Sequence, residues 1–335
     1  MSRRTWWFVL VCVLAAGGAV VAGAVDLGRQ QAIVRADTRP VTAPAVVAPD
    51  GPRIVFRNTS LGDKFGLVAT VALDDPAGPR TLSDLSCERI DMTPAGGSCL
   101  QSERGMVTHY SWLDLDPAMR PVHDEPLTGI PSRTRMSPDG SLTASTVFVS
   151  GHSYMDHGFS TATTVREAGG GRTWGNLERF ALTIDGERVD ARDRNVWGVT
   201  FVDDSTFYAT VATGGAAWLV RGDLGDRTLT SVRAGAECPS VSPDGTRVAY
   251  KVDVAPGAEV RWVVAVLDLA SGREWVLDRG GSLDDQVEWL DDDSVLYGRP
   301  RADQPGVTDV MVLDVDADTD PRVLIEQAWS PSVVR

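Results

Sequence analysis

The stretches Met136-Ser137-Pro138-Asp139-Gly140-Ser141 and Val241-Ser242-Pro243-Asp244-Gly245-Thr246 are two copies of one short pattern, and this pattern decides the fold. In each copy Pro presets φ, Asp can hydrogen-bond back to the backbone, and Gly takes a positive φ. Alternating small and apolar residues follow both copies, as expected of a half-buried strand. The pattern therefore predicts a tight turn between two antiparallel strands.

Four weaker copies of the pattern follow the same frame, at Ala48-Pro49-Asp50-Gly51, Thr93-Pro94-Ala95-Gly96, Asp203-Asp204-Ser205 and Asp291-Asp292-Asp293. Counted from the residue before the turn, the six copies start at Val47, Met92, Met136, Phe201, Val241 and Trp289, with spacings of 45, 44, 65, 40 and 48 residues. Repeats of this length with four strands each are typical of β-propeller blades. We therefore expect an all-β, six-bladed β-propeller over residues 47–335, in which Phe180–Ile184 supplies a strand of the third blade.

The end of the chain indicates how the ring closes. Ser330-Pro331-Ser332-Val333-Val334 is similar to Cys238-Pro239-Ser240-Val241-Ser242, the innermost strand of a blade, but no further blade follows it. The first repeat has the complementary defect, because it lacks an innermost strand. We therefore expect the C-terminal strand to complete the first blade, which removes open sheet edges.

The two strong turns, and strands such as Arg247-Val248-Ala249-Tyr250, resemble the repeats of TolB-like propellers, also called PD40 or WD40-like repeats. This resemblance covers residues 47–335 and implies a six-bladed fold that binds proteins or ligands through one face of the disc. A closer similarity is to secreted or anchored TolB-like proteins of actinobacteria. It is carried by Gly151-His152-Ser153-Tyr154, Gly158-Phe159-Ser160-Thr161, Trp197-Gly198-Val199-Thr200-Phe201, Glu237-Cys238-Pro239-Ser240 and Asp284-Asp285-Gln286-Val287.

Residues 6–25 form a run without a charge that is long enough to cross a bilayer as a helix. Arg3 and Arg4 precede the run, so the positive-inside tendency places the rest of the chain outside the cytoplasm. We expect a single-pass segment at 1–25, a linker at 26–46 and an extracytoplasmic propeller. The alternative is a signal peptide cleaved after Ala24, which would release the domain.

Charge and cysteine content restrict the function classes. The formal net charge of -14 argues against binding to nucleic acid, which needs clustered Lys and Arg, and no cofactor or metal motif is found. We expect a monomer. Export makes Cys87, Cys99 and Cys238 candidates for oxidation, and Cys87 with Cys99 is the favoured bridge because the two flank one predicted turn. Cys238 is then expected to be a buried thiol.

The one oversized spacing suggests where a ligand binds. It places extra residues, 150–176, in a loop of the third blade, on the face where the innermost strands begin. Long loops on rigid scaffolds often carry binding residues. We therefore predict contacts to a ligand or partner on this face. The candidates in the loop are His152, Ser153, Tyr154, Asp156, His157, Phe159 and Glu167, and those at the strand starts are Arg133, Arg194, Asn195, Asp285 and Gln286.

Three other interpretations of Gly151-His152-Ser153-Tyr154-Met155-Asp156-His157 remain open. A metal site at His152, Asp156 and His157 has a spacing that suits neither a helix face nor a strand face. A Ser153 nucleophile lacks the second glycine of its elbow motif. A polar loop that satisfies its own backbone is the plainest alternative. Our main hypothesis is a non-catalytic module that binds an extracellular or envelope protein or a small ligand, and the alternative is a lyase or hydrolase with its site at the channel mouth.

Overall fold

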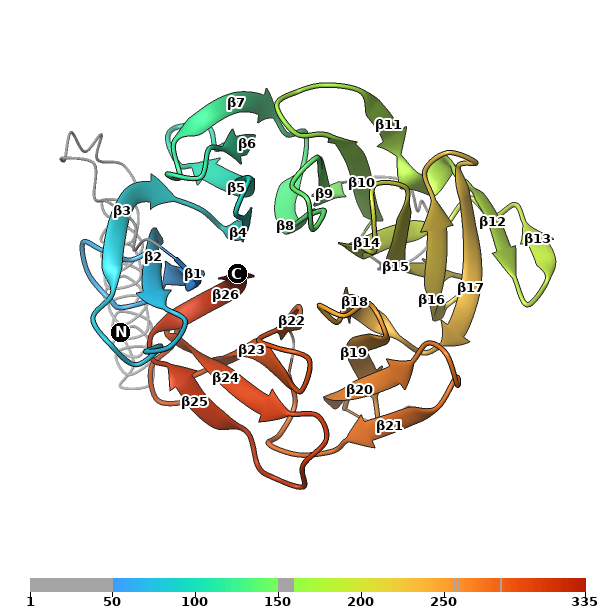
Figure 1. Cartoon of the computed structure of the whole chain (residues 1–335). Helices are drawn as coiled ribbons and strands as arrows, with labels where there is room; N and C mark the ends of the chain where they lie inside the picture. The colour runs from blue at the N-terminus through green and yellow to red at the C-terminus, as the bar shows by residue number, and fades with distance from the viewer. Residues whose placement is uncertain (1–50, 150–159, 256, 258, 284) are drawn as a thin grey trace, which may run out of the picture.

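The computed structural model describes residues 51–149, 160–255, 257, 259–283 and 285–335. These residues form six sheets arranged as blades around a central axis, as Figure 1 shows, and all strand pairs but one are antiparallel. The predicted six-bladed, all-β fold is therefore confirmed. The predicted segments 1–25 and 26–46 lie outside the described residues. Within the described part of the chain, no helix is long and apolar enough to span a bilayer.

Five of the blades have four strands and one has six, and the strands are ordered here from the axis outward. Blades 1 and 4 are described below. Blade 2 contains β4 (Arg89–Thr93), β5 (Gly96–Glu103), β6 (His109–Leu115) and β7 (Pro121–Pro126). Blade 3 contains β8 (Ile130–Met136), β9 (Leu142–Val149), β10 (Ser160–Glu167) and β11 (Thr173–Asn176). Blade 5 contains β18 (Glu237–Val241), β19 (Arg247–Asp253), β20 (Trp262–Asp268) and β21 (Glu274–Leu277). Blade 6 contains β22 (Glu288–Trp289), β23 (Ser294–Pro300), β24 (Thr308–Asp314) and β25 (Arg322–Ile325).

Blade 1 joins the two ends of the propeller. Its strands are β26 (Ala328–Val334), β1 (Arg53–Asn58), β2 (Leu67–Ala72) and β3 (Thr81–Ser86). The C-terminal strand β26 is innermost and pairs antiparallel with β1, with Val334 opposite Arg53 and Val333 opposite Ile54. The predicted closure by the last strand is therefore confirmed.

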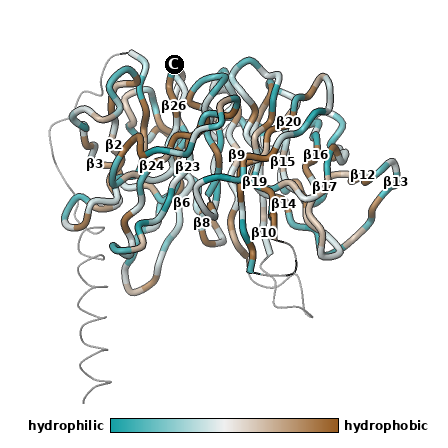
Figure 2. The backbone as a smooth tube through the Cα atoms, turned by 90° about the horizontal axis from the view of Figure 1, so that it is seen from below, coloured by the Kyte–Doolittle hydropathy of each residue, from teal (hydrophilic) through white to brown (hydrophobic). Residues whose placement is uncertain are grey.

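The loop predicted at 150–176 is wrong over residues 160–176, and residues 150–159 lie outside the described part of the chain. Residues 160–176 are not an inserted loop, because they form β10 and β11, the third and fourth strands of blade 3. The extra length lies further along, in a 3-10 turn η1 (Leu177–Arg179) and a hairpin of β12 (Ala181–Ile184) and β13 (Glu187–Val189). β12 pairs in parallel with β17 of blade 4, so Phe180–Ile184 does not supply a strand of the third blade. Figure 2 shows this hairpin projecting from the side of the disc.

The rest of blade 4 consists of β14 (Asn195–Phe201), β15 (Thr206–Thr213), β16 (Ala216–Asp223) and β17 (Thr228–Ala234). The core lies between blades, because alternate residues of each strand face the neighbouring sheet. Five apolar clusters fill the contacts between blades 1 and 2, 3 and 4, 4 and 5, 5 and 6, and 6 and 1. The contact between blades 2 and 3 contains a buried ion pair instead. Arg166 donates to Asp114 at 2.7 and 3.1 Å, and its guanidinium lies 3.9 Å from the centroid of the Trp112 ring.

Candidate functional site

The strand order gives the disc two different faces. Every innermost strand begins on one face, which we call the loop face, and ends on the other, which we call the turn face. In Figure 2 the end of β26, marked C, lies on the turn face at the top. Ser-Pro-Asp-Gly turns lie on the turn face, because they connect the end of an innermost strand to the next strand. The predicted assignment of these turns to one face is confirmed.

The turn face is strongly acidic. Its strand connections hold fourteen aspartates and five arginines. In the two strong turns the aspartate closes the turn: Asp139 Oδ1 accepts from Ser137 Oγ at 2.6 Å and Ser141 N at 3.0 Å, and Asp244 repeats both bonds with Ser242 and Thr246. The aspartates of the strong turns are therefore structural. The fourteen are Asp74, Asp75, Asp116, Asp139, Asp203, Asp204, Asp226, Asp244, Asp291, Asp292, Asp293, Asp316, Asp318 and Asp320.

The loop face is hollowed where blades 1, 2 and 3 meet. We call this cavity of about 370 Å³ the mouth pocket. Its walls come from strand starts and strand ends at the channel entrance, and they combine arginines with aromatic side chains. The lining residues are Glu88, Arg89, Ser102, Arg104, Thr108, Tyr110, Ile130, Pro131, Ser132, Arg133, Phe148 and Trp329.

Arg89 is fixed in the mouth pocket by contacts from two other blades. Its Nη1 donates to Asp285 Oδ1 at 2.8 Å, and its guanidinium lies 4.7 Å from the centroid of the Trp329 ring. Gly298 permits this arrangement, because a Cβ there would lie 2.5 Å from the Trp329 ring and 2.8 Å from Asp285 Oδ2. Burial lowers the pKa of the Arg89 guanidinium and nearby Arg133 lowers it further, while Asp285 opposes both. Arg89 and Arg133 are therefore close enough to repel each other.

A second charged group borders the mouth pocket. Glu88 lies 3.1 Å from Arg57 Nη1 and 3.5 Å from Arg104 Nη2. Arg57 also donates to the carbonyl oxygen of Cys87 at 2.5 Å. Cys87 forms a disulfide with Cys99, as predicted, and Cys238 is a buried free thiol. The disulfide therefore anchors the segment that presents Glu88 and Arg89.

Exposed apolar side chains flank the mouth pocket, and we call four of them the apolar rim. Met106 and Val107, in the connection between β5 and β6, are 107% and 67% exposed. Ile130 and Phe148, which are opposite each other on β8 and β9, are 57% and 38% exposed. The other exposed large apolar residues in the described part of the chain are Leu61 and Val260 on loops of the same face, and Val122, Val232, Val276 and Val323 on the fourth strand of their blades, counted from the axis. The loop face is therefore the more apolar of the two faces.

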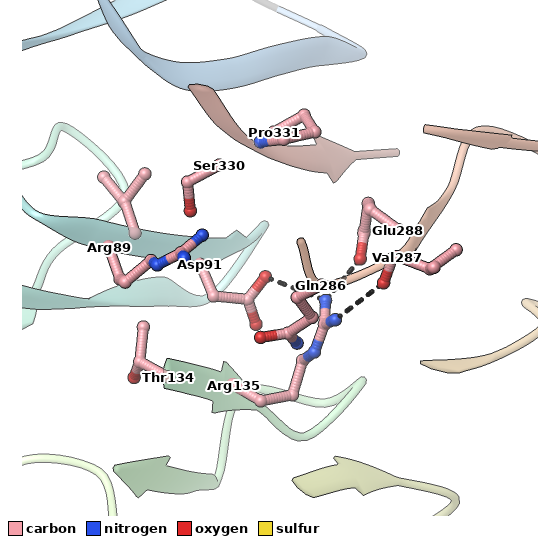
Figure 3. A pocket seen from close by; sticks show the side chains of 10 residues that line it. Arg89, Asp91, Thr134, Arg135, Gln286, Val287, Glu288, Ser330 and Pro331 are labelled. Carbon is pink, nitrogen blue, oxygen red and sulfur yellow. Dashed lines mark hydrogen bonds and ion pairs between the residues drawn. The ribbon is translucent and has the colours of Figure 1, made fainter. Parts of the chain in front are cut away.

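Below the mouth pocket, a polar group that we call the channel network crosses the axis. It comprises Asp91, Arg135, Gln286, Glu288 and Ser332, from four different blades. Figure 3 shows the Arg135 guanidinium pointing toward Asp91 and Glu288. Arg135 forms ion pairs with Glu288 and with Asp91, the latter at 3.5 Å, and donates to the carbonyl oxygen of Val287 at 3.2 Å. Gln286 accepts from Arg135 Nε at 3.1 Å when its amide oxygen faces the guanidinium.

The two carboxylates of the channel network also hold neighbouring strands together. Asp91 accepts from the Met136 backbone N–H at 2.6 Å and from Ser332 Oγ at 2.9 Å. Burial alone would lower the pKa of Arg135, but Glu288 and Asp91 outweigh burial and raise it. Arg135 is therefore a permanent cation that blades 2 and 6 share.

On the turn-face side of this network lies a second cavity, of about 380 Å³, with walls that include Pro94, Pro138, Pro243, Phe201 and Trp289.

The structure brings together some of the candidate residues that the sequence suggested. Arg133 lines the mouth pocket, Asp285 holds Arg89 there, and Gln286 belongs to the channel network. Arg194 and Asn195 serve the fold instead. Arg194 Nη1 donates to the Phe180 carbonyl oxygen at 2.8 Å, and Asn195 Oδ1 accepts from the Thr161 backbone N–H at 2.8 Å.

Glu167 is on the other face from the one we predicted. It lies at the turn-face end of β10, opposite Leu142, and its Oε2 accepts from the Arg172 backbone N–H at 3.0 Å. The prediction failed because Ser160–Glu167 was assigned to a loop, whereas it is a strand that carries the chain back across the disc. The remaining candidates, His152, Ser153, Tyr154, Asp156, His157 and Phe159, lie outside the described residues.

The sequence also contained a signal for the channel network that we did not use. Charged or amide side chains occur at alternate positions on two innermost strands and at the entry to a third, as Arg89 with Asp91, Arg133 with Arg135, and Gln286 with Glu288. Alternate residues of a strand share a face, so each pair points to the same side of its strand. Pairs of this kind on innermost strands predict a polar channel. No group of three or more His, Cys, Asp or Glu residues suited to a metal ion occurs in the described parts of the chain.

One buried carboxyl group was not predicted at all. Glu178 of η1 accepts from Thr161 Oγ1 at 3.0 Å, and from the backbone N–H groups of Thr163 and Val196 at 3.2 Å. Burial raises its pKa to about 7, although these hydrogen bonds oppose the rise. Glu178 thus joins blade 3 to blade 4 near the loop face.

No family model matches this chain, and no curated protein matches it either. Solved structures are similar in fold. TolB from Acinetobacter baumannii has a TM-score of 0.58 and 15% identity over 85% of this chain and 67% of its own. A putative TolB from Agrobacterium tumefaciens has a TM-score of 0.49 and 14% identity over 82% and 88%. A puromycin-hydrolyzing peptidase of Mycobacterium tuberculosis has a TM-score of 0.50 and 12% identity over 84% of this chain and 44% of its own. The similarity to TolB from Acinetobacter baumannii supports the six-bladed propeller fold, and fold does not determine function.

Proposed function

We propose that this chain is a non-catalytic binding propeller that stands outside the cytoplasmic membrane and docks a partner protein on its loop face. The observation that carries the proposal is the apolar rim beside the mouth pocket. Four large side chains stay exposed at the entrance of a cavity of about 370 Å³ that contains arginine and aromatic residues. Exposed apolar groups beside polar ones mark interaction sites, and Arg, Tyr and Trp are enriched at binding hot spots.

The extracytoplasmic location is supported by two independent features. Residues 6–25 have the length and composition of a membrane-spanning segment preceded by arginines. The Cys87–Cys99 disulfide is typical of proteins that fold in an oxidising compartment. We therefore place the propeller on the outer side of the membrane, either anchored by residues 6–25 or released by cleavage after Ala24.

Labelling of intact spheroplasts tests the location. An Ala118→Cys variant places a thiol on an exposed turn-face position. A maleimide reagent that does not cross membranes should label this thiol equally well before and after detergent is added. Labelling that appears only after detergent would contradict the proposed location.

Photo-crosslinking tests the binding surface. A photoreactive amino acid replaces Met106 or Val107 in the full chain, and crosslinking is carried out in cells of the organism that encodes it. We expect both positions to give the same adduct. Positions Val276 and Val323, which are 43% and 42% exposed on outermost strands, are the matched controls and should not give it.

A substitution sharpens this experiment. Ile130→Asp should weaken the adduct at Met106 about tenfold, because loss of an interface hot spot costs more than ~1 kcal/mol. The matched change Val276→Asp should leave the adduct unchanged. Equal crosslinking from the rim and the control positions, or none from the rim, would contradict docking at the loop face. We do not propose catalysis, because no arrangement among the described residues singles out a nucleophile or an acid and base pair.

A further inference from the structure

The second cavity, on the turn-face side of the channel network, has a candidate occupant in the chain itself. We call it the turn-face cavity, and we propose that it is filled by residues 35–46 of the same molecule, which we call the linker segment. This inference goes beyond the proposed function, because it concerns the face opposite the apolar rim. It rests on the cavity walls, on charge and on the point where the described chain begins.

The turn-face cavity is one end of the central channel. Its volume of about 380 Å³ falls in the range of ~300–1,000 Å³ that is typical of ligand sites. Every blade contributes an apolar residue to the walls, and the channel network forms the floor. These wall residues are Val333, Pro94, Pro138, Phe201, Pro243 and Trp289, for blades 1 to 6 in that order.

The linker segment matches these walls in composition. From Pro40 to Val46 it reads Pro-Val-Thr-Ala-Pro-Ala-Val, without a charge. Proline fixes φ and favours the extended polyproline II conformation, which docks into grooves that contain aromatic side chains. Because proline already restricts the free chain, docking costs less conformational entropy than it would for a flexible segment.

Charge favours the same occupant. The turns at 137–140, 202–205, 242–245 and 290–293, next to the cavity walls, hold seven aspartates and no basic residue. The linker segment has two arginines, Arg35 and Arg39, and one acidic residue, Asp37. Its apolar part can therefore enter the cavity while its arginines lie near the aspartates of the turns.

Other charges at the cavity do not cancel this attraction. The lining contains two arginines, Arg135 and Arg335, but also the carboxylates of Asp91 and Glu288. Arg247, at the start of β19, pairs with Asp293 at 3.5 Å and offsets part of the charge of the turns. Carboxylates therefore outnumber arginines in the cavity and its surrounding turns.

The described chain begins beside the cavity. Arg53, the first residue of β1, is opposite Val334, and the neighbours of Val334 in sequence line the cavity. Figure 1 shows the end marked C close to the central axis. Residues 47–50 join the linker segment to Gly51 and span up to about 13 Å at ~3.3 Å per residue. A segment tethered this closely has an effective concentration in the millimolar range, so a weak intrinsic affinity is enough.

Docking of the linker segment would close the turn-face end of the channel. The mouth pocket would then be the open end, on the side where the apolar rim lies. The contact is available both to the anchored chain and to a chain cleaved after Ala24, because both keep residues 35–46.

Photo-crosslinking within the purified full chain, in detergent, tests the inference. A photoreactive amino acid replaces Val41 or Val46, and mass spectrometry locates the adducts. Both positions precede the first strand of the propeller, so the changes leave its core intact. We expect intramolecular adducts with peptides that contain Pro94, Pro138 or Pro243.

Charge variants make the result specific. Arg35→Glu combined with Arg39→Glu should lower the adduct yield at Val41 about fivefold, because the reversed charges repel the aspartates. The matched control is Arg188→Glu combined with Arg192→Glu, which changes the net charge equally at exposed positions of the β12–β13 hairpin and should leave the yield unchanged. Adding Asp204→Arg, at an exposed position beside the cavity, to the linker variant should restore part of the yield.

The opposing outcomes are distinct. Adducts confined to loop-face connections, or no adduct with the propeller, would overturn the inference. An adduct between two chains that maps to the same cavity would assign the site to a second copy and overturn the intramolecular contact. Equal yields in the linker variant and the matched control would overturn it as well, because charge would then not guide the contact. Crosslinking at Met106 reports separately on docking at the loop face, so either proposal can fail without the other.

Discussion

The two faces of this disc are built from the same strands but differ in charge and apolar surface. Connections on the turn face hold fourteen aspartates and five arginines. The described connections on the loop face hold seven carboxylates and five basic residues. This count leaves out residues 177–194, which contain η1 and the β12–β13 hairpin. Of the ten exposed large apolar residues in the described part of the chain, six lie on the loop face and four lie on the fourth strands of their blades, counted from the axis. The blade repeat dictates neither difference.

The difference in charge follows from the structural role of the turn-face aspartates. Turn-face aspartates are needed locally, because they accept hydrogen bonds that close short turns. Loop-face connections vary in length from blade to blade, and the one between β5 and β6 exposes the apolar side chains of Met106 and Val107. The channel network lies between these two environments and separates the mouth pocket from the cavity on the turn face. Three changes, one in the network and one on each side of it, test this contrast.

The largest effect is expected from Arg135→Ala. Arg135 is 11% exposed and pairs with Glu288 and Asp91, which are 12% and 7% exposed. Its loss would leave two buried carboxylates facing each other without a cation, and breaking such a pair costs about 3–5 kcal/mol. Urea denaturation should show this fall in the free energy of unfolding.

Two further variants control for a general effect of removing an arginine. Arg120→Ala breaks an exposed turn-face pair with Asp116 at 2.7 Å and should cost less than ~1 kcal/mol. Adding Glu288→Gln to Arg135→Ala should restore part of the stability, because it removes one unpaired charge. If Arg135→Ala and Arg120→Ala lower the free energy of unfolding equally, the channel network contributes no more stability than an exposed turn-face ion pair.

The next effect is a loss of stability with rising pH, which should come from Glu178 near the loop face. Burial raises the pKa of Glu178 from its ordinary value to about 7 in the folded chain. The folded state therefore binds this proton more tightly than the unfolded state, and the resulting stability is complete below pH ~4.3. It should be lost as pH rises to about 7, by roughly 3 kcal/mol.

The comparison of Glu178→Gln with the unmodified chain isolates this contribution. Unfolding free energies measured between pH 4.5 and 8 should fall less steeply in the variant, because glutamine does not titrate. The matched variant Glu167→Gln, on the turn face, should keep the slope of the unmodified chain. Parallel slopes for Glu178→Gln and the unmodified chain would contradict the raised pKa.

The fold was predictable from the sequence wherever a local pattern repeated. The Ser-Pro-Asp-Gly turns at 137–140 and 242–245 set the blade period, and the similarity of Ser330–Val334 to another innermost strand predicted the closure. Blade 3 was the exception. The oversized spacing led us to assign β10 to a loop, but Thr163 of this strand is fully buried, and a hydrogen bond joins its hydroxyl to that of Thr146 at 2.8 Å. Those tertiary contacts are invisible to a local pattern.

The candidate site was predictable in part. The direction of the innermost strands predicted that Arg133 and Asp285 lie on the same face, at the channel entrance, and the structure places both there. The pairing of Arg89 with Asp285 and Trp329 joins residues 196 and 240 positions apart, so only closure of the ring brings them together. Glu178 was missed because its burial depends on the path of residues 177–194, and the spacing between sequence repeats does not define that path.

The smallest effect is expected on the turn face, from Asp139→Ala and Asp244→Ala. Each aspartate accepts two side-chain hydrogen bonds and one backbone hydrogen bond within its own turn, so each loss should cost about 1 kcal/mol. Hydrogen bonds from Ser242 and Thr246 lower the pKa of Asp244, so the stability it contributes is present above pH ~3.9 and is lost as pH falls through the lowered pKa. This acid-side dependence is opposite in sign to that of Glu178. Denaturation of Asp244→Ala and Asp244→Asn between pH 2 and 5 measures this dependence. If Asp244→Ala lowers the free energy of unfolding as much as Arg135→Ala does, the turn contributes as much stability as the channel network, which would contradict the expected order.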